Sequence, residues 1–140
     1  MKKRKISIST IILIIVFLVG LSVMLYPAVS DYWNSKTQSH AIAEYDEILN
    51  NMDDKQYQKL LSEAEDYNER LKSLYSPLEN YSEIEGYENA LDVTGTGIMG
   101  YVTIPEISVE LPIYHGTSDE VLNVAVGHVQ GSTLPIGGKS

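Results

Sequence analysis

Histidine is the residue type best suited to proton transfer at neutral pH, and this chain contains three histidines. His128 lies in the segment VAVGHVQGSTLPIGGKS, next to Gly127 and close to a second glycine-bearing turn. A catalytic acid or base and a turn-stabilising side chain are the alternative roles for it. The chain contains no cysteine, which excludes a disulfide, a thiolate nucleophile and a cysteine-based metal site within these 140 residues.

Two glycine-rich stretches resemble phosphate-binding motifs but lack the required context. Gly95–Gly100 matches G-x-G-x-x-G literally, yet a polar acidic stretch precedes it and the strand-like sequence Tyr101–Ile104 follows. A dinucleotide site needs a strand before the motif and a helix after it. Gly138-Lys139-Ser140 resembles the end of a P-loop, but position 133, where that loop needs glycine, is Thr133. We therefore expect no nucleotide cofactor, and we interpret the first motif as a flexible lead into a strand.

The charge of the chain is unevenly distributed. The net charge is −9, although four of the ten basic residues lie together in Lys2–Lys5. From Asp31 onward there are six basic and 19 acidic residues, a net charge of −13. Nucleic-acid binding requires clustered Lys and Arg, so we expect no nucleic-acid partner. The acidic pair Asp53-Asp54 lacks the spacing of a calcium loop, and we expect solvated acidic surfaces and no metal site.

The segment Ile6–Tyr26 contains 21 residues and no charge. About 20 apolar helical residues cross a hydrocarbon core, so the segment is long enough for a membrane anchor. The basic flank should stay cytoplasmic, which places the rest of the chain outside the cell. A cleaved signal peptide is the alternative, because Ala28-Val29-Ser30 resembles a cleavage site, although the apolar run exceeds that of a typical signal. A buried soluble helix is a third alternative.

Apolar residues from Asp31 to about Tyr75 follow helical spacing. Asn50–Asp53 interrupts the pattern, and Asp53 with Gln56 has the spacing of a capping box, which predicts that a second helix begins there. Pro77 is expected to end that second helix. Each helix carries one apolar face, formed in the first by Ala41, Ile42, Tyr45, Ile48, Leu49 and Met52, and in the second by Tyr57, Leu60, Leu61, Ala64, Tyr67, Leu71 and Leu74.

The last third of the chain has the pattern of β-structure. Gly97–Ile104 reads as a strand that Pro105 stops, and Ile107–Tyr114 alternates as a second strand in which Pro112 indicates an edge or a bulge. Thr117 and Glu120 have capping-box spacing and predict a short helix that Gly127 ends. The segment from Val129 is turn-rich. Two or three strands cannot close a barrel, so the fold looks interrupted.

The residues of this region resemble the start of the catalytic domain of class C sortases, the pilin-polymerising transpeptidases of Gram-positive bacteria. The matching residues are Ile104-Pro105-Glu106-Ile107, Leu111–Gly116, Gly127-His128, and Ser132-x-Leu134-Pro135-x-Gly137-Gly138. The basic N-terminus, the apolar segment and the two acidic helices also resemble that family's anchor and N-terminal extension.

The resemblance implies a membrane-anchored cysteine transpeptidase or hydrolase that joins pilin subunits at the cell surface. A cysteine thiolate would attack an LPxTG-like sorting signal, a histidine would act as general acid and base, and an arginine would stabilise the oxyanion. In the family these three residues come after the Leu-Pro-x-Gly-Gly turn, hence beyond Ser140. We therefore expect no catalytic residue in this chain. His128 and His115 are then turn-stabilising side chains, and His40 is a surface or packing residue.

Many class C sortases carry a lid with an Asp-Pro-aromatic motif after the second helix. The corresponding residues here are Ser76, Pro77 and Leu78, which retain the proline but neither the acidic group nor the ring. The resemblance thus implies a degenerate lid, and a simple helix stop is the alternative.

The expected fold is α+β: an N-terminal transmembrane helix, two acidic amphipathic helices, and the first strands of an incomplete sortase-type β-barrel. The expected regions are a cytoplasmic flank (1–5), an anchor (6–29), an extracytoplasmic helical extension (30–78), a linker or lid region (79–94) and a truncated barrel domain (95–140). The expected partners are the membrane and, for a full-length enzyme, pilin or LPxTG-type proteins. A noncatalytic membrane-anchored interaction module, or a pseudogene product, is the alternative.

Overall fold

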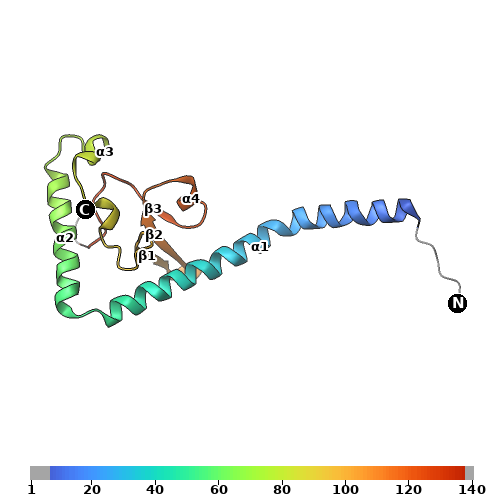
Figure 1. Cartoon of the computed structure of the whole chain (residues 1–140), viewed down its shortest axis with the longest axis horizontal. Coiled ribbons are helices and arrows are strands. Elements are labelled where there is room, and N and C mark those ends of the chain that lie inside the picture. Colours follow the sequence, from blue (N-terminus) through green and yellow to red (C-terminus); the bar gives the residue numbers. More distant parts are fainter. Residues whose placement is uncertain (1–6, 138–140) are drawn as a thin grey trace. The chain divides into compact units, whose positions relative to one another are not determined.

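The computed structural model describes residues 7–137 (Figure 1). The chain has two compact units, Met1–Lys36 and Thr37–Ser140. The predicted basic flank and the Gly138-Lys139-Ser140 motif lie outside the described residues. The first helix, α1 (Ile8–Asn51), begins in the first unit and ends in the second.

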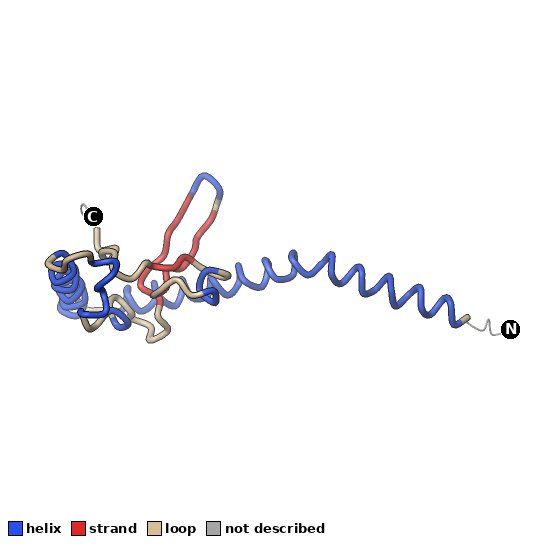
Figure 2. Tube along the Cα trace, turned by 90° about the horizontal axis from the view of Figure 1, so that it is seen from above, coloured by secondary structure: helices blue, strands red, loops and turns tan. Residues whose placement is uncertain are grey.

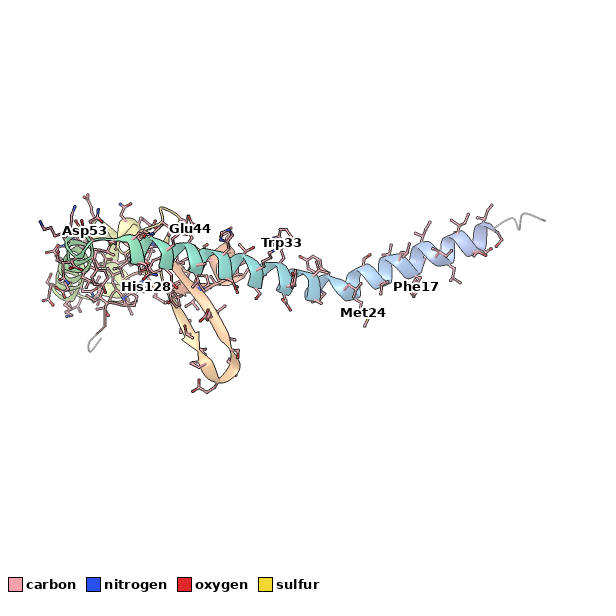
Figure 3. The ribbon with its side chains drawn as sticks, turned by 90° about the horizontal axis from the view of Figure 1, so that it is seen from below. Phe17, Met24, Trp33, Glu44, Asp53 and His128 are labelled. Atoms are coloured by element: carbon pink, nitrogen blue, oxygen red, sulfur yellow. The ribbon has the colours of Figure 1, made fainter. Side chains whose placement is uncertain are left out.

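The described part of the first unit, residues 7–36, contains the long apolar stretch of α1. Its side chains are exposed along the helix, as Phe17 (63% exposed) and Met24 (79% exposed) illustrate (Figure 3). The helix continues through Pro27, a residue that removes one backbone donor from the helical ladder. Its length and composition suffice to cross a membrane, a property that an N-terminal signal sequence shares.

The predicted break between the two helices is confirmed. Helix α1 ends at Asn51, and α2 (Asp54–Lys72) begins after the N-cap residue Asp53. A carboxylate oxygen of Asp53 accepts the backbone N–H of Gln56 at 2.7 Å, and the Gln56 side chain accepts the backbone N–H of Asp53 at 3.3 Å. This reciprocal pair satisfies two backbone donors that the helix start would leave unbonded.

The prediction that Pro77 ends the second helix is wrong. Helix α2 ends at Lys72, where the backbone N–H and the hydroxyl of Ser73 both bond to the carbonyl of Arg70. These local bonds replace the continuation of the helical ladder. Pro77 instead occupies the first position of the short helix α3 (Pro77–Asn80), where a missing backbone N–H carries no cost.

The core of the second unit forms between α2 and the segments that follow it. The inner face of α2 contributes Ala64, Tyr67 and Leu71, and this cluster is completed by Ile84, Tyr87, Leu91, Met99 and Leu134. Two short 3₁₀ helices, η1 (Tyr81–Glu83) and η2 (Tyr87–Asn89), bring the middle of the chain to α2. The buried side chain of Asn68 both donates to the carbonyl of Leu134 (3.2 Å) and accepts its N–H (2.7 Å). Asn68 thereby holds an extended segment against α2, as a neighbouring strand would.

Three strands form one sheet in the order β1-β2-β3: β1 (Ile98–Ile104), β2 (Val109–His115) and β3 (Val126–His128). Strands β1 and β2 are antiparallel, and their hairpin extends away from the rest of the second unit (Figure 2). Pro105 ends β1 as predicted and starts the 3₁₀ turn η3 (Pro105–Ile107) at the hairpin tip.

Pro112 lies on β2, opposite Tyr101 of β1, and the bulge that Pro112 was expected to mark lies instead on β1, between Ile98 and Gly100. Strand β3 pairs only with Ile113–His115, so β2 has a strand partner on one side alone at Pro112 within the described residues. The edge interpretation of Pro112 therefore holds, because a residue without a backbone donor fits where no second strand pairs.

Two details of the predicted short helix are wrong. Helix α4 (Asp119–Leu122) is capped by Ser118, whose side chain accepts the N–H of Val121, and not by Thr117. The helix ends at Leu122, and Gly127 lies in β3. The reason for glycine at 127 is steric, because a Cβ there would lie 2.5 Å from the carbonyl oxygen of Gly116.

Candidate functional site

The hydroxyl of Tyr87 is the centre of a polar cluster beneath the ends of β2 and β3. It donates to the carbonyl of His128 at 2.9 Å, accepts the N–H of Gly116 at 3.0 Å, and lies 3.0 Å from Nδ1 of His128. Tyr87 is buried in the core between α2 and the sheet. One side chain thus connects two points of the backbone, at Gly116 and His128, to a third segment of the chain, its own.

His115 and His128 are register partners on the parallel strands β2 and β3. The ring of Tyr87 contacts both, edge-on to His115 with centroids 5.0 Å apart and tilted to His128 at 5.7 Å. The ring nitrogens of His115 lie 2.8 Å from the carbonyl oxygens of Gly97 and Ala90. We name these three side chains, Tyr87, His115 and His128, the Tyr–His cluster.

His128 has the contacts expected of a turn-stabilising histidine. Its Nε2 lies 3.1 Å from the carbonyl oxygen of Thr133, across the turn formed by residues 129–133. The hydroxyl of Ser132 closes the same turn by donating to the carbonyl of Val129 at 2.7 Å. Both ring nitrogens of His128 therefore face structural partners. His40, in contrast, is exposed on α1.

Burial raises the pKa of Tyr87 above the ordinary tyrosine value, a rise that the Gly116 N–H partly offsets and that the charge of Glu88 reinforces. The hydroxyl is consequently protonated at neutral pH and acts as a hydrogen-bond donor. The chemistry available to the Tyr–His cluster is the positioning of backbone segments. The 140 residues supply no nucleophilic thiol, because they include no cysteine.

The glycine-rich stretch 95–100 leads directly into β1, so the interpretation of this motif as a lead into a strand is confirmed. The carboxylate of Asp92 accepts the backbone N–H groups of Gly95 at 2.8 Å and of Gly97 at 2.9 Å. Amides that a phosphate would need are thus already bonded. Within residues 7–137, no group of three or more His, Asp or Glu side chains is arranged to hold a metal ion.

The predicted lid residues lie at the start of α3. Ser76 has a left-handed backbone conformation (φ +51°), Pro77 is the first residue of the helix, and the side chain of Leu78 is 63% exposed. The backbone of Pro77 and Leu78 lies directly against Gly131, in the turn that follows His128. The structure therefore brings the lid-like segment to the turn that the Tyr–His cluster holds.

Sequence reasoning missed the roles of Tyr87, Asn68 and Gly131. Tyr87 is one of ten tyrosines, and its partner His128 is 41 residues away, so no local spacing identifies the pair. The presence of glycine at position 131 was a weak sequence signal of a special backbone conformation, because glycine is favoured where the backbone is left-handed. Gly131 has this conformation (φ +87°).

Solved structures similar to this chain are class C sortases. Sortase C1 from Streptococcus agalactiae is 38% identical, with a TM-score of 0.59 over 71% of this chain and 52% of that chain. Sortase C from Streptococcus pneumoniae is 35% identical, with a TM-score of 0.57 over 71% of this chain and 50% of that chain. Clostridium perfringens sortase C, solved in complex with the C-terminal cell wall sorting signal motif, is 32% identical, with a TM-score of 0.51 over 71% of this chain and 47% of that chain.

The chain spans about half the length of these sortases. Neither a protein-family model nor a curated protein sequence matches it. The chain has a sortase-like fold, with a long apolar N-terminal helix, further helices and a three-stranded sheet. The resemblance that the sequence indicates is thereby confirmed: over nearly three quarters of its length, this chain is similar in sequence and fold to class C sortases.

Proposed function

We propose that this chain is the first part of a membrane-anchored class C sortase that joins pilin subunits through LPxTG-like sorting signals. The observation that carries the proposal is the 38% identity to Streptococcus agalactiae sortase C1 over 71% of the chain. The complex of Clostridium perfringens sortase C with a sorting signal supports a substrate of this class.

The chemistry proposed for the whole enzyme is cysteine transpeptidation. A thiolate attacks the Thr–Gly carbonyl of the sorting signal, the glycine amine leaves with a proton from a histidine, and a pilin lysine amine then resolves the acyl-enzyme. An arginine stabilises the oxyanion. None of these groups is assigned to the 140 residues. The proposed contribution of the 140 residues is a scaffold, in which the Tyr–His cluster fixes the ends of β2 and β3.

We propose that the apolar part of α1 anchors the protein in the cell membrane, with residues 1–5 in the cytoplasm and the residues after the anchor outside the cell. The helix is long and apolar enough, and its large apolar side chains between Ile8 and Val29 are exposed. The proposed regions are 6–29 for the anchor, 30–78 for an extension of two acidic amphipathic helices, 79–94 for a linker or lid region and 95–140 for the start of the barrel. Ser76, Pro77 and Leu78 are the proposed degenerate lid.

The test is a transpeptidation assay on two proteins. The first is this chain, and the second is the chain extended by the reading frame that follows the Ser140 codon. With an LPxTG peptide and a pilin lysine donor, the proposal predicts a thiol-dependent product from the extended protein and none from the 140 residues. Product that forms from the 140 residues and resists thiol-blocking reagents would refute the cysteine mechanism.

A noncatalytic membrane-anchored module is the second candidate. It is favoured by the outer edges of the sheet, because β1 has a strand partner only on the β2 side within the described residues. An open edge can pair with an extended segment of a partner. The extended protein separates the candidates, since a module of this kind would bind a pilus protein without any turnover.

A further inference from the structure

We propose that the turn formed by residues 129–133 is a seat for α3, and that Gly131 is the residue that sets the position of this helix. The inference rests on the proposed function only in regarding α3 as part of a lid. The contact itself is a property of this chain and can be tested without any enzymatic activity. We call residues 129–133 the Gly131 turn.

The contact between the Gly131 turn and α3 is between backbones. A Cβ placed at Gly131 would lie 2.7 Å from the carbonyl oxygen of Pro77 and 2.8 Å from Cα of Leu78. It would also lie 3.1 Å from the backbone nitrogen of Leu78. Backbone atoms cannot move aside as the end of a flexible side chain can. Any residue other than glycine at 131 must therefore displace either the turn or α3.

The Gly131 turn is the better anchored of the two partners. His128 bonds across it to Thr133, and Tyr87 holds the carbonyl of His128 at the start of the turn. Asn68 on α2 holds both backbone groups of Leu134, the residue that follows it. A side chain at 131 should consequently displace α3 and leave the turn in place.

The hydrogen bonds that α3 makes among residues 7–137 are all local, formed within the helix or with the residues just before it. The backbone N–H groups of Glu79 and Asn80 bond to the carbonyl of Ser76, and the Asn80 side chain bonds to the carbonyl of Tyr75. No residue of α3 is buried, and none of the ion pairs among the described residues involves it. Ser76, at the start of α3, has a left-handed conformation that costs a non-glycine residue free energy. A single helical turn held by these local bonds is only marginally stable by itself, so α3 should open more often when the contact with the Gly131 turn is lost.

Amide hydrogen exchange of the purified full chain in detergent micelles tests the seat. In Gly131→Ala, the amides of Glu79 and Asn80 should exchange about tenfold faster, whereas amides in the centre of α2 keep their rates. Gly137→Ala is the matched control. Gly137 is also left-handed (φ +88°), but a Cβ there meets nothing within 4 Å. The control therefore carries the same backbone strain without the collision.

Equal exchange rates at Glu79 and Asn80 in the two variants would overturn the proposal. So would a rise that α2 shares, because that pattern reports general unfolding. Leu78→Ala gives a further check, since an exposed side chain contributes little to a backbone contact and its removal should leave the rates near those of the parent chain.

A second measurement needs no variant and holds even if Gly131→Ala does not fold. The parent chain should show a nuclear Overhauser effect between an α-hydrogen of Gly131 and the amide or α-hydrogen of Leu78. The absence of that effect would refute the seat. A seat that is present while the extended protein lacks transpeptidase activity would refute only the proposed function, so the two failures are distinguishable.

Discussion

Tyr87 and His128 are joined at two points, because the Tyr87 hydroxyl donates to the carbonyl of His128 at 2.9 Å and lies 3.0 Å from its Nδ1. The two residues are 41 positions apart, one on η2 and the other on β3. The pair connects the segment after α3 with the turn on which α3 rests. Tyr87 is therefore the residue through which the helical part of the second unit positions the end of its sheet.

Tyr87→Phe keeps the ring and removes the hydroxyl. The N–H of Gly116 and the carbonyl of His128 then lose their shared partner, and an unsatisfied buried group costs about 1–3 kcal/mol. We expect the free energy of unfolding of the second unit to fall by about this amount in a urea titration. Tyr75→Phe is the control, because Tyr75 is 90% exposed and its hydroxyl should contribute little. Equal stability of the two variants would contradict the role assigned to Tyr87.

Asn68→Ala should destabilise the second unit by a similar mechanism. Both the N–H and the carbonyl of Leu134 lose their side-chain partner beside α2, so the expected cost is about 1–3 kcal/mol or more. Asn68→Asp restores only the acceptor, and it should not recover the stability of the parent chain. Urea midpoints measure both changes. A midpoint for Asn68→Asp equal to that of the parent chain would show that the donated bond is dispensable.

Sequence reasoning predicted the elements whose signals are local. The capping box of Asp53 and Gln56 fixed the start of α2, and Pro105 fixed the end of β1, because each signal acts within a few residues. Neighbouring hydroxyls at Thr117 and Ser118 offered two caps one residue apart, and backbone geometry at Ser118 decided between them. The predicted end of α2 was wrong because a second stop signal precedes Pro77. Ser73 bonds to the carbonyl of Arg70 and ends the helix there.

The candidate site could not be predicted in the same way. Tyr87 meets His128 only because η2 and β3 come together in the folded chain, and Asn68 meets Leu134 across 66 residues. The resemblance to class C sortases located the lid-like residues by their motif alone. It gave no indication that Gly131 contacts them, because that contact depends on a left-handed backbone and not on a side chain.

Alkaline pH should weaken the second unit. Burial raises the pKa of Tyr45, Tyr67, Tyr87 and Tyr114 in the folded chain. A raised pKa in the folded state means that stability is fully present below the unfolded pKa of about 10 and is lost as pH rises toward the folded values. We expect the urea midpoint to decline above about pH 10, and tyrosinate absorbance of the folded chain to lag behind that of the unfolded chain. Coincident absorbance curves would contradict the burial of these hydroxyls.

Tyr45→Phe should make that decline shallower, because one titrating group disappears. The same change removes the bond from the Tyr45 hydroxyl to the carbonyl of Met99 (3.0 Å), so the variant should be less stable at neutral pH. The slope of stability against pH therefore separates the titration from the lost hydrogen bond. An unchanged slope would assign the alkaline effect to other groups.

The proposed anchor predicts an intact protein in the membrane. When the 140 residues are expressed by themselves, the membrane fraction should hold a chain of 15.6 kDa that resists alkaline extraction. Val16→Arg places a charge in the proposed span at a cost of about 2.5–3.5 kcal/mol and should reduce insertion. Tyr75→Arg, an exposed position of the second unit, should leave insertion unchanged. A shorter protein whose sequence begins just after Ala28-Val29-Ser30 would instead identify the segment as a cleaved signal peptide.

We have proposed that these residues are the first part of a class C sortase. The most direct measurement is to sequence the source DNA beyond the Ser140 codon. The proposed function predicts an open reading frame that encodes a strand with a Gly-His-Arg-type turn and, later, a strand that ends in Thr-Cys. A stop codon directly after Ser140, with no such frame downstream, would contradict the enzyme and favour the interaction module or a pseudogene product.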